Sequence, residues 1–196
     1  MSHHVHTTPA YILSSRDIGE ASKILTLFSR DHGVIEGIAQ GVRFNKSKLR
    51  YALPEFSRPL VSLVRGREYW RIVGAVYHPR EEVAPPPGEA LTLYVRVLAL
   101  IRQLAPLEAE NQELFIEIEQ AFRHLRALSV PEELKNFEAI LVLRVLKNLG
   151  YIGERAALSK FMDSFVWSSG ILGEISDVRE EAIRAINESL AATQLV

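Results

Sequence analysis

The hydrophobic pattern of this 196-residue chain changes near residues 85–88, which read Pro85-Pro86-Pro87-Gly88. Proline continues neither a strand ladder nor a helix interior, so this run predicts a boundary. Before it, short β-type runs separated by Gly and Asp turns predict a small barrel or sandwich. After it, apolar residues recur at spacings of three and four, which predicts amphipathic helices. We therefore expect an α+β chain, with a β domain over residues 1–82 and an all-α helical domain over residues 83–196.

The individual elements follow from the same patterns. Strands are expected over residues 8–15, 23–28, 34–38, 59–64 and 69–76, and helices over residues 89–104 and 110–128. Ser129-Val-Pro131-Glu132 is typical of a capped helix start, and that helix should end near Gly150. Apolar residues nearly encircle it, so we expect it at the centre of the helical core. Residues 151–175 are ambiguous, and Ser176-Asp177 should open a last helix, with Ile183 among its inward residues.

The net charge of −1 conceals an asymmetry between the two parts. Residues 1–80 hold 12 Lys or Arg against 6 Asp or Glu, a net +6, whereas the remainder holds 11 against 18, a net −7. The positive charge is densest between Arg43 and Arg71. A basic patch of this kind attracts a phosphate backbone. From composition alone, a basic but merely solvated surface is an equally good interpretation.

Composition and motifs exclude several classes of protein. The chain has no cysteine, so thiol chemistry, disulfides and cysteine-ligated metal sites are excluded. No apolar stretch reaches the roughly 18–20 residues of a membrane helix, and the first residues lack the pattern of a signal peptide, so we expect a cytoplasmic protein without membrane contact. No nucleophile elbow, Walker loop or paired acid–base carboxylates occur, so we expect no enzyme and no cofactor. His3, His4 and His6 make a poor metal site on an unstructured terminus, and His32 and His78 are isolated in the sequence.

Several motifs resemble one known family, the bacterial recombination mediator RecO. They are the opening stretch over residues 10–33, with Arg16-Asp17-Ile-Gly19-Glu20 inside it, then Gly37-Ile-Ala-Gln-Gly41-Val-Arg43, Lys46-Ser-Lys48-Leu-Arg50 and Leu53-Pro-Glu-Phe56. The resemblance is specific over about residues 8–80. Phe137 to Tyr151 is a looser match, to the segment that precedes a zinc module in many members. The missing cysteines argue against that module here, and the short chain suggests a reduced C-terminal region.

The resemblance implies an N-terminal OB-fold barrel and a C-terminal helical domain in a cytoplasmic, nucleoid-associated protein. It also implies binding to single- and double-stranded DNA, annealing of complementary strands, and cooperation with RecR and single-stranded DNA-binding protein (SSB) to load RecA in repair. Its helical domain would take up the acidic C-terminal tail of SSB. An OB-fold protein-interaction adaptor that has lost DNA binding is the alternative, and a cryptic hydrolase is a more distant one.

Single strands bind OB folds through a cationic groove and aromatic platforms for the bases. The predicted DNA-binding residues are Arg16, Arg43, Lys46, Lys48, Arg50, Arg65, Arg67 and Arg71. Arg16 contacts DNA or pairs with Asp17 or Glu20. Tyr51, Tyr69 and Trp70 stack on bases or fill the core, whereas Phe44 and Phe56 are expected to pack. The SSB tail needs an apolar pocket beside basic residues, for which Phe122, Arg123, Arg126 and Arg144 are candidates.

Overall fold

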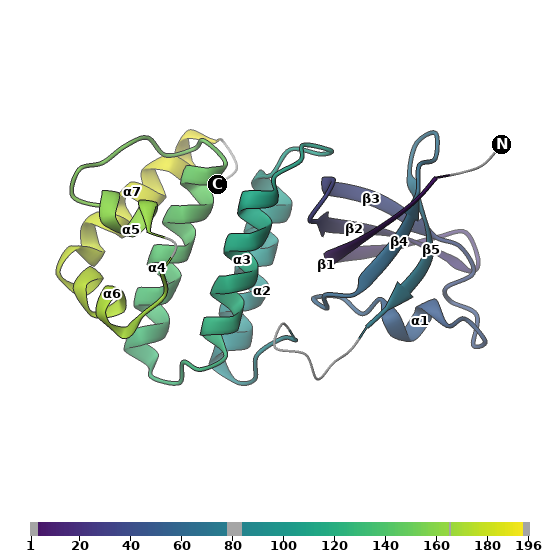
Figure 1. The fold of residues 1–196 in the computed structure, drawn as a ribbon, viewed down its shortest axis with the longest axis horizontal. Coiled ribbons are helices and arrows are strands. Elements are labelled where there is room, and N and C mark those ends of the chain that lie inside the picture. The colour runs from purple at the N-terminus through teal and green to yellow at the C-terminus, as the bar shows by residue number, and fades with distance from the viewer. Residues whose placement is uncertain (1–3, 78–83, 165, 194–196) are drawn as a thin grey trace. The chain divides into compact units, whose positions relative to one another are not determined.

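The computed structural model describes residues 4–77, 84–164 and 166–193 (Figure 1). These residues form two compact units. The first comprises the residues up to Pro85 together with Leu98–Phe115, and the second comprises Pro86–Val97 and the residues from Ile116 onward. The junction between residues 82 and 83 lies outside the described residues, so the domain limits 1–82 and 83–196 stay a prediction.

The N-terminal strands close into a barrel in the order β1-β2-β3-β5-β4 (Figure 1). They are β1 (Val5–Ile18), β2 (Ser22–Ser29), β3 (Gly33–Ala39), β4 (Leu60–Val64) and β5 (Trp70–Val76), with the short helix α1 (Leu49–Ala52) between β3 and β4. All neighbours are antiparallel except β3 and β5. A five-stranded barrel with this topology is the OB fold. The predicted class, α+β with an OB barrel followed by helices, is confirmed.

The strand β1 is longer than predicted because its two ends pair with different neighbours. Residues Val5 to Pro9 pair with β4, and residues Ala10 to Ile18 pair with β2, with a register shift between Ile12 and Ser14. Such a bulge bends the strand and strengthens its twist. One strand can therefore take part in two stretches of a small closed barrel.

Both faces of β1 are buried in its central part. Ala10 and Ile12 lie in the barrel core, whereas Tyr11 is fully buried outside it and its ring centroid lies 5.4 Å from that of Phe115. Phe28 of β2 also meets Phe115, at 5.3 Å. A strand covered on both faces reads as continuously apolar rather than alternating. This is why the run through Tyr11-Ile12-Leu13 shows no polar face.

The segment around Glu108, which belongs to the first unit, is fastened to the start of β3. The Glu108 amide donates to the Val34 carbonyl over 2.7 Å, and Leu107 forms a parallel bridge with Val34. Gly33 has φ +63°, and a Cβ placed on it would lie 1.9 Å from the Ala109 carbonyl oxygen. Only glycine fits this contact without displacing the backbone.

We predict that Gly33→Ala destabilises the protein by at least about 2 kcal/mol, because it adds a backbone clash to a positive-φ strain. Denaturant unfolding measures the change. Gly173→Ala is the matched control, because nothing lies within 4 Å of the Cβ it adds and its φ is ordinary. Equal stability of the two variants would contradict the close packing of Gly33.

The helices are α2 (Glu89–Leu104), α3 (Gln112–Leu125), α4 (Pro131–Asn148), α5 (Ser159–Asp163), α6 (Ser169–Glu174) and α7 (Arg179–Ala192), with a 3-10 turn over Ile175–Val178. In the second unit α4 packs against α5, α6 and α7. Its buried residues include Phe137, Leu143 and Val145, which lie on different sides of the helix. The predicted central position of this helix is confirmed. Within the described ranges, no helix combines the length and apolar character of a membrane span.

Three local predictions in this part were wrong. Ser129 caps no helix, because α4 begins at Pro131 after Val130 and has no side-chain cap. Ser176 lies in the 3-10 turn, where its hydroxyl accepts a hydrogen bond from Asn136 Nδ2 over 2.9 Å, and α7 begins only at Arg179. Ile183 is 46% exposed, because small side chains such as Ala182 and Ala185 form the buried face of α7.

Candidate nucleic-acid interface

The connection from β3 to β4, residues 40–59, contains the densest group of predicted cations, and its first part is held against the turn between β1 and β2. The Arg43 amide donates to the Ala21 carbonyl over 2.9 Å, and the Arg43 guanidinium donates to the Gly19 carbonyl over 3.3 Å. The Gly41 amide donates to Ser22 Oγ over 3.3 Å. We call residues 40–53 the cationic loop. Its N-terminal part is thus fixed in place by the hairpin beside it.

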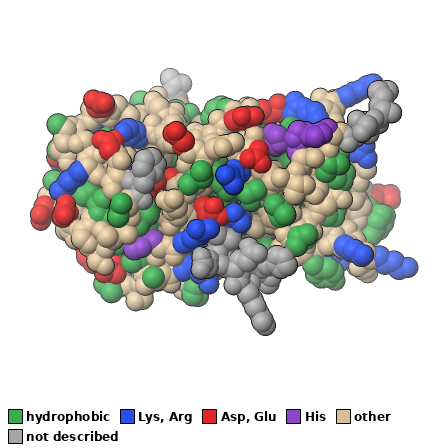
Figure 2. Space-filling view, in the orientation of Figure 1, with side chains coloured by type: hydrophobic (Ala, Val, Ile, Leu, Met, Phe, Trp, Pro, Cys, Tyr) green, Lys and Arg blue, Asp and Glu red, His purple; other side chains and the backbone are tan. Residues whose placement is uncertain are grey.

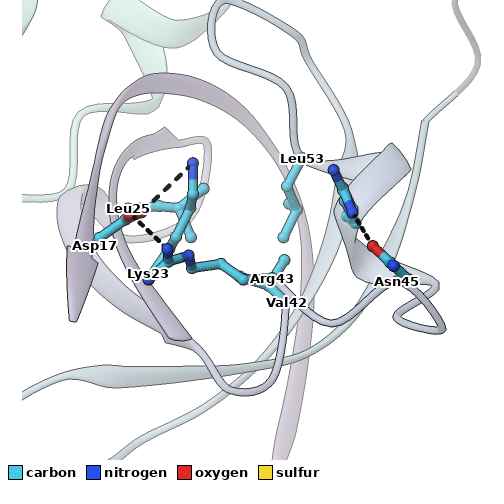
Figure 3. Close-up of a pocket in the computed structure, with 8 residues that line it drawn as sticks. Asp17, Lys23, Leu25, Val42, Arg43, Asn45 and Leu53 are labelled. Carbon is cyan, nitrogen blue, oxygen red and sulfur yellow. Dashed lines mark hydrogen bonds and ion pairs between the residues drawn. The ribbon is translucent and has the colours of Figure 1, made fainter. Parts of the chain in front are cut away.

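A cavity of about 460 Å³ opens between this loop and the barrel strands (Figure 3). Figure 3 shows Asp17 and Lys23 on one side and Asn45 on the other, with Val42 and Leu53 between them. The apolar lining residues Leu25, Val42 and Leu53 are buried. The full lining is Asp17, Lys23, Leu25, Val42, Arg43, Asn45, Arg50 and Leu53. The cavity therefore combines an apolar floor with three cations and one carboxylate.

The charges around the cavity are paired only weakly. Asp17 lies 3.3 Å from an Arg43 nitrogen and 3.8 Å from Lys23 Nζ. Arg50 donates to the Asn45 side-chain oxygen over 2.8 Å rather than to a carboxylate. Exposed ion pairs are worth about 0–1 kcal/mol, so a phosphate can replace these contacts at little cost.

Four further predicted cations project from the barrel without a carboxylate partner among the described residues. Lys46 and Lys48 are exposed on the cationic loop, Arg67 lies in the β4–β5 connection, and Arg71 begins the outward side of β5. Together with Arg43 and Arg50 they are the predicted cations that remain most available to an external anion. In the OB fold, the β1–β2 and β4–β5 connections flank the ligand-binding face.

Arg16 and Arg65 have partners within the barrel unit. Arg16 pairs with Glu36 at 3.7 Å and donates to the Tyr69 hydroxyl over 3.4 Å. The alternative that it pairs with Asp17 or Glu20 was therefore wrong, and its contact with DNA stays a prediction. Arg65 forms a two-pronged pair with Glu108, with one N–O distance of 2.9 Å, and lies 5.0 Å from the centroid of the Trp70 ring. Its guanidinium lowers the pKa of the Glu108 carboxyl. Arg65 is therefore already engaged by an anion.

The aromatic residues that are exposed and those that are buried differ in part from the sequence prediction. Phe44 is 64% exposed and Tyr51 is 74% exposed, so the prediction that Phe44 packs was wrong. Phe44 lies over Gly41, whose missing Cβ leaves room for the ring. Phe56 is half-buried. Trp70 is only 7% exposed and belongs to the barrel core, which agrees with the second of its two predicted roles.

Histidines that are distant or isolated in the sequence meet beside Trp70. The ring centroids of His4 and His6 lie 4.6 Å apart, and those of His6 and His32 lie 5.0 Å apart (Figure 2, purple patch on the barrel). His6 is part of β1 rather than of an unstructured terminus, and His32 is not isolated. Burial lowers the pKa of His32. Among the residues that the structure describes, no group of three or more His, Asp or Glu could hold a metal ion. His3 and His78 lie outside those residues.

The four residues predicted to bind the acidic SSB tail differ in exposure: two are buried in the second unit and two are on its surface. Phe122 is buried, and its ring centroid lies 4.2 Å from that of Tyr94. The Arg144 side chain is 3% exposed and pairs with Glu117 at 2.9 Å, while its Nε donates to the Phe161 carbonyl and Trp167 covers it. Arg123 and Arg126 are exposed, and Arg123 lies 3.6 Å from Glu119. Phe122 and Arg144 are thus part of the core as the unit stands.

A second cavity in the same unit has the chemistry that such a tail requires. It measures about 480 Å³, and its lining is Arg96, Lys135, Glu138, Ala139, Val142, Arg179, Ile183, Ile186 and Asn187. The apolar side chains come from α4 and α7, and the three cations stand around them. Arg96 pairs with Glu138, and Arg179 pairs with Glu132. No sequence pattern indicated this cavity, because Ile183 was predicted to face inward and only the structure shows it 46% exposed.

The chain is thus an OB-fold protein: a closed barrel carries exposed cations and is followed by helices. Such a surface suits a polyanionic ligand.

Residues 1–76 match the family described as recombination protein O N terminal. The chain is 33% identical over 152 residues to a protein named DNA repair protein RecO from Pelotomaculum thermopropionicum. The aligned residues cover 75% of this chain and 56% of that protein. A protein of the same name from Myxococcus xanthus is 32% identical over 139 residues, 66% of this chain and 54% of that protein. One from Bifidobacterium animalis is 40% identical over 60 residues, 31% of this chain and 25% of that protein.

The chain belongs to the RecO family. It spans about half the length of the first two relatives. The resemblance found in the motifs of the barrel is confirmed, and the match over 152 residues extends beyond the barrel strands.

We predict that Arg144→Ala destabilises the protein by about 3–5 kcal/mol, because Glu117 is left as an unpaired buried charge. Replacing both residues, with Glu117→Leu and Arg144→Met, should recover most of that loss. Denaturant unfolding measures both, with the exposed Arg184→Ala as the control in the same unit. A single variant as stable as the control would show that the pair is not buried in solution.

Proposed function

We propose that this chain binds single- and double-stranded DNA through the cationic loop and the adjoining barrel loops, and acts in recombinational DNA repair. In this role it anneals complementary strands and cooperates with RecR and SSB to load RecA, without hydrolysing a nucleotide. The observation that carries the proposal is the placement of Lys46, Lys48, Arg67 and Arg71. These cations are exposed on an OB barrel and have no carboxylate partner among the described residues.

Electrostatics favours DNA over a neutral ligand at this surface. Each phosphate that a Lys or Arg neutralises releases condensed counterions, and this contribution is independent of base identity. The same cations can contact a duplex, which supports binding to both forms. Neutralising phosphates on two strands also lowers their mutual repulsion, which is a physical route to annealing.

The second cavity supports the proposed contact with the SSB tail. An acidic peptide that ends in an apolar residue needs an apolar pocket with cations at its rim. Val142, Ile183 and Ile186 supply the pocket, and Arg96, Lys135 and Arg179 supply the rim. The cations already hold Glu132 and Glu138 in exposed pairs, which incoming carboxylates can replace. We therefore propose this cavity in place of the buried Phe122 and Arg144, with Arg123 and Arg126 outside it.

The alternative is an OB-fold adaptor that binds proteins only. It shares the barrel, the helices and the second cavity, but it predicts no affinity for DNA. A mobility shift of labelled single-stranded DNA at low salt separates the two functions. A shift supports the proposal, whereas retention of SSB binding without a shift favours the adaptor.

We predict that Lys46→Ala combined with Lys48→Ala weakens single-strand binding at least several-fold for every sequence tested. The slope of log affinity against log salt should fall by about 1.4, because two phosphate contacts are lost at about 0.7 each. Fluorescence anisotropy over a salt series measures both quantities. The control is Lys160→Ala with Arg184→Ala, which removes the same charge from the helical unit. An unchanged slope in the barrel variant would remove the cationic loop from the interface.

We predict that Ile183→Asp weakens binding of an acidic peptide with an apolar C-terminal residue roughly tenfold or more, because it places a like charge in the apolar pocket. The residue is exposed, so the fold should be retained. Anisotropy of a labelled peptide measures the affinity. Val130→Asp, at another exposed apolar position of the helical unit, is the control. Equal affinity of both variants would exclude this cavity as the tail site.

A further inference from the structure

The first cavity, beside the cationic loop, has features that binding of the DNA phosphate backbone alone does not require. Contacts to phosphates need only exposed cations, such as Lys46 and Lys48. Beside them the chain builds a half-open cavity of about 460 Å³ with an apolar floor, which is within the range of pockets that take small ligands, ~300–1,000 Å³. We infer that this cavity receives one unstacked nucleotide of a DNA single strand. The inference rests on the proposed function and assigns to it a specific subsite.

The lining matches the two chemically different parts of a nucleotide. Leu25, Val42 and Leu53 pack mainly into the barrel core, and their exposed edges form the apolar part of the lining that the face of a base can contact. Lys23, Arg43 and Arg50 supply the charge for its phosphate. A phosphate alone would leave the apolar floor unused, and a purely apolar ligand would desolvate three cations without a partner.

Two polar groups can meet the edge of the base. Asp17 is a hydrogen-bond acceptor, and Asn45 carries both a donor and an acceptor. Figure 3 shows these two side chains on different sides of the cavity. Their present partners are exposed cations, at 3.3 Å for Asp17 and Arg43 and 2.8 Å for Asn45 and Arg50. A bound nucleotide would thus exchange one set of polar contacts for another.

The walls of the cavity are preorganised. Gly19 and Gly41 adopt positive φ angles of +57° and +64°, which turn the chain sharply beside the cavity. Between them, Arg43 joins the cationic loop to the β1–β2 turn through its amide and its guanidinium. A site that is already ordered loses less conformational freedom when a ligand binds.

Exposed aromatic residues adjoin the lining residues in the sequence. Phe44 lies between Arg43 and Asn45, and Tyr51 follows Arg50. Bases that neighbour the captured nucleotide can stack on such rings, at about 1–3 kcal/mol per base. A strand could then keep its other bases on the surface while one enters the cavity.

The test uses the full chain and the shortest oligothymidylate that it binds at full affinity. OB folds cover roughly 4–16 nucleotides, so this oligonucleotide is short enough to hold one register. A single abasic site is placed at each position in turn, and anisotropy gives the affinity. We expect one position at which the loss of the base lowers affinity about 5- to 150-fold more than at any other. A second series compares strands with and without a 5′ or 3′ phosphate.

Asn45→Trp narrows the cavity from its exposed rim and should remove the position dependence while binding persists. Leu60→Trp, at an exposed position on β4 outside both the lining and the cationic loop, is the matched control and should keep it. The abasic series on the unmodified chain decides the matter even where a variant fails to fold. If an abasic site lowers the affinity equally at every position, the nucleotide subsite is overturned but the proposed DNA binding is not. A loss that follows only a terminal phosphate also overturns it, because the cavity then holds a phosphate alone. No binding of the unmodified strand overturns the proposed function itself, and the subsite with it.

Discussion

Closure of the barrel depends on one short parallel contact between β3 and β5. Only Gly37 and Ile38 pair with Trp70 and Arg71, yet this contact turns four antiparallel strand pairs into a closed ring. Gly37 permits it, because a Cβ there would lie 3.0 Å from Ile72 and 3.1 Å from Leu27 inside the barrel. With the ring closed, the chain must leave β3 and return to β4 outside it. The cationic loop is that return path, so the position of its charges follows from the closure.

The helical unit depends on a different constraint, a charge that it buries. Arg144 on the central helix α4 has only 3% of its side chain exposed, and it is satisfied by Glu117, by backbone carbonyls and by the face of Trp167. Burying an ion pair costs desolvation, so its contribution lies in fixing which segments meet rather than in net stability. The pair joins α3 and α4, and the carbonyl of Phe161 brings in α5. Desolvation lowers the pKa of Arg144, although the guanidinium remains charged near neutral pH.

The sequence was sufficient for the fold class and for the order of the strands and long helices, because these follow from local patterns, whereas the short helices α1, α5 and α6 were not predicted. The proline run, the short strands and the apolar spacing of α2 all depend on residues within one turn or one strand of each other. The site could be predicted only in part. Which cations remain available depends on partners far away in sequence, such as Glu108 for Arg65 and Glu117 for Arg144. Phe44 was predicted to pack because its side chain is apolar. The sequence does not show that the loop carrying it leaves it 64% exposed. Neither cavity could be derived, since each is lined by several elements of its unit.

The central claim is that DNA lies on the barrel at the cationic loop. Hydrogen–deuterium exchange of the chain with and without saturating single-stranded DNA tests it directly, because bound phosphates and bases slow exchange where they cover the backbone. The account predicts slower exchange over residues 17–23 and 40–53, and no comparable change over α4 and α7. Protection confined to the helical unit, with residues 40–53 unaffected, would contradict it.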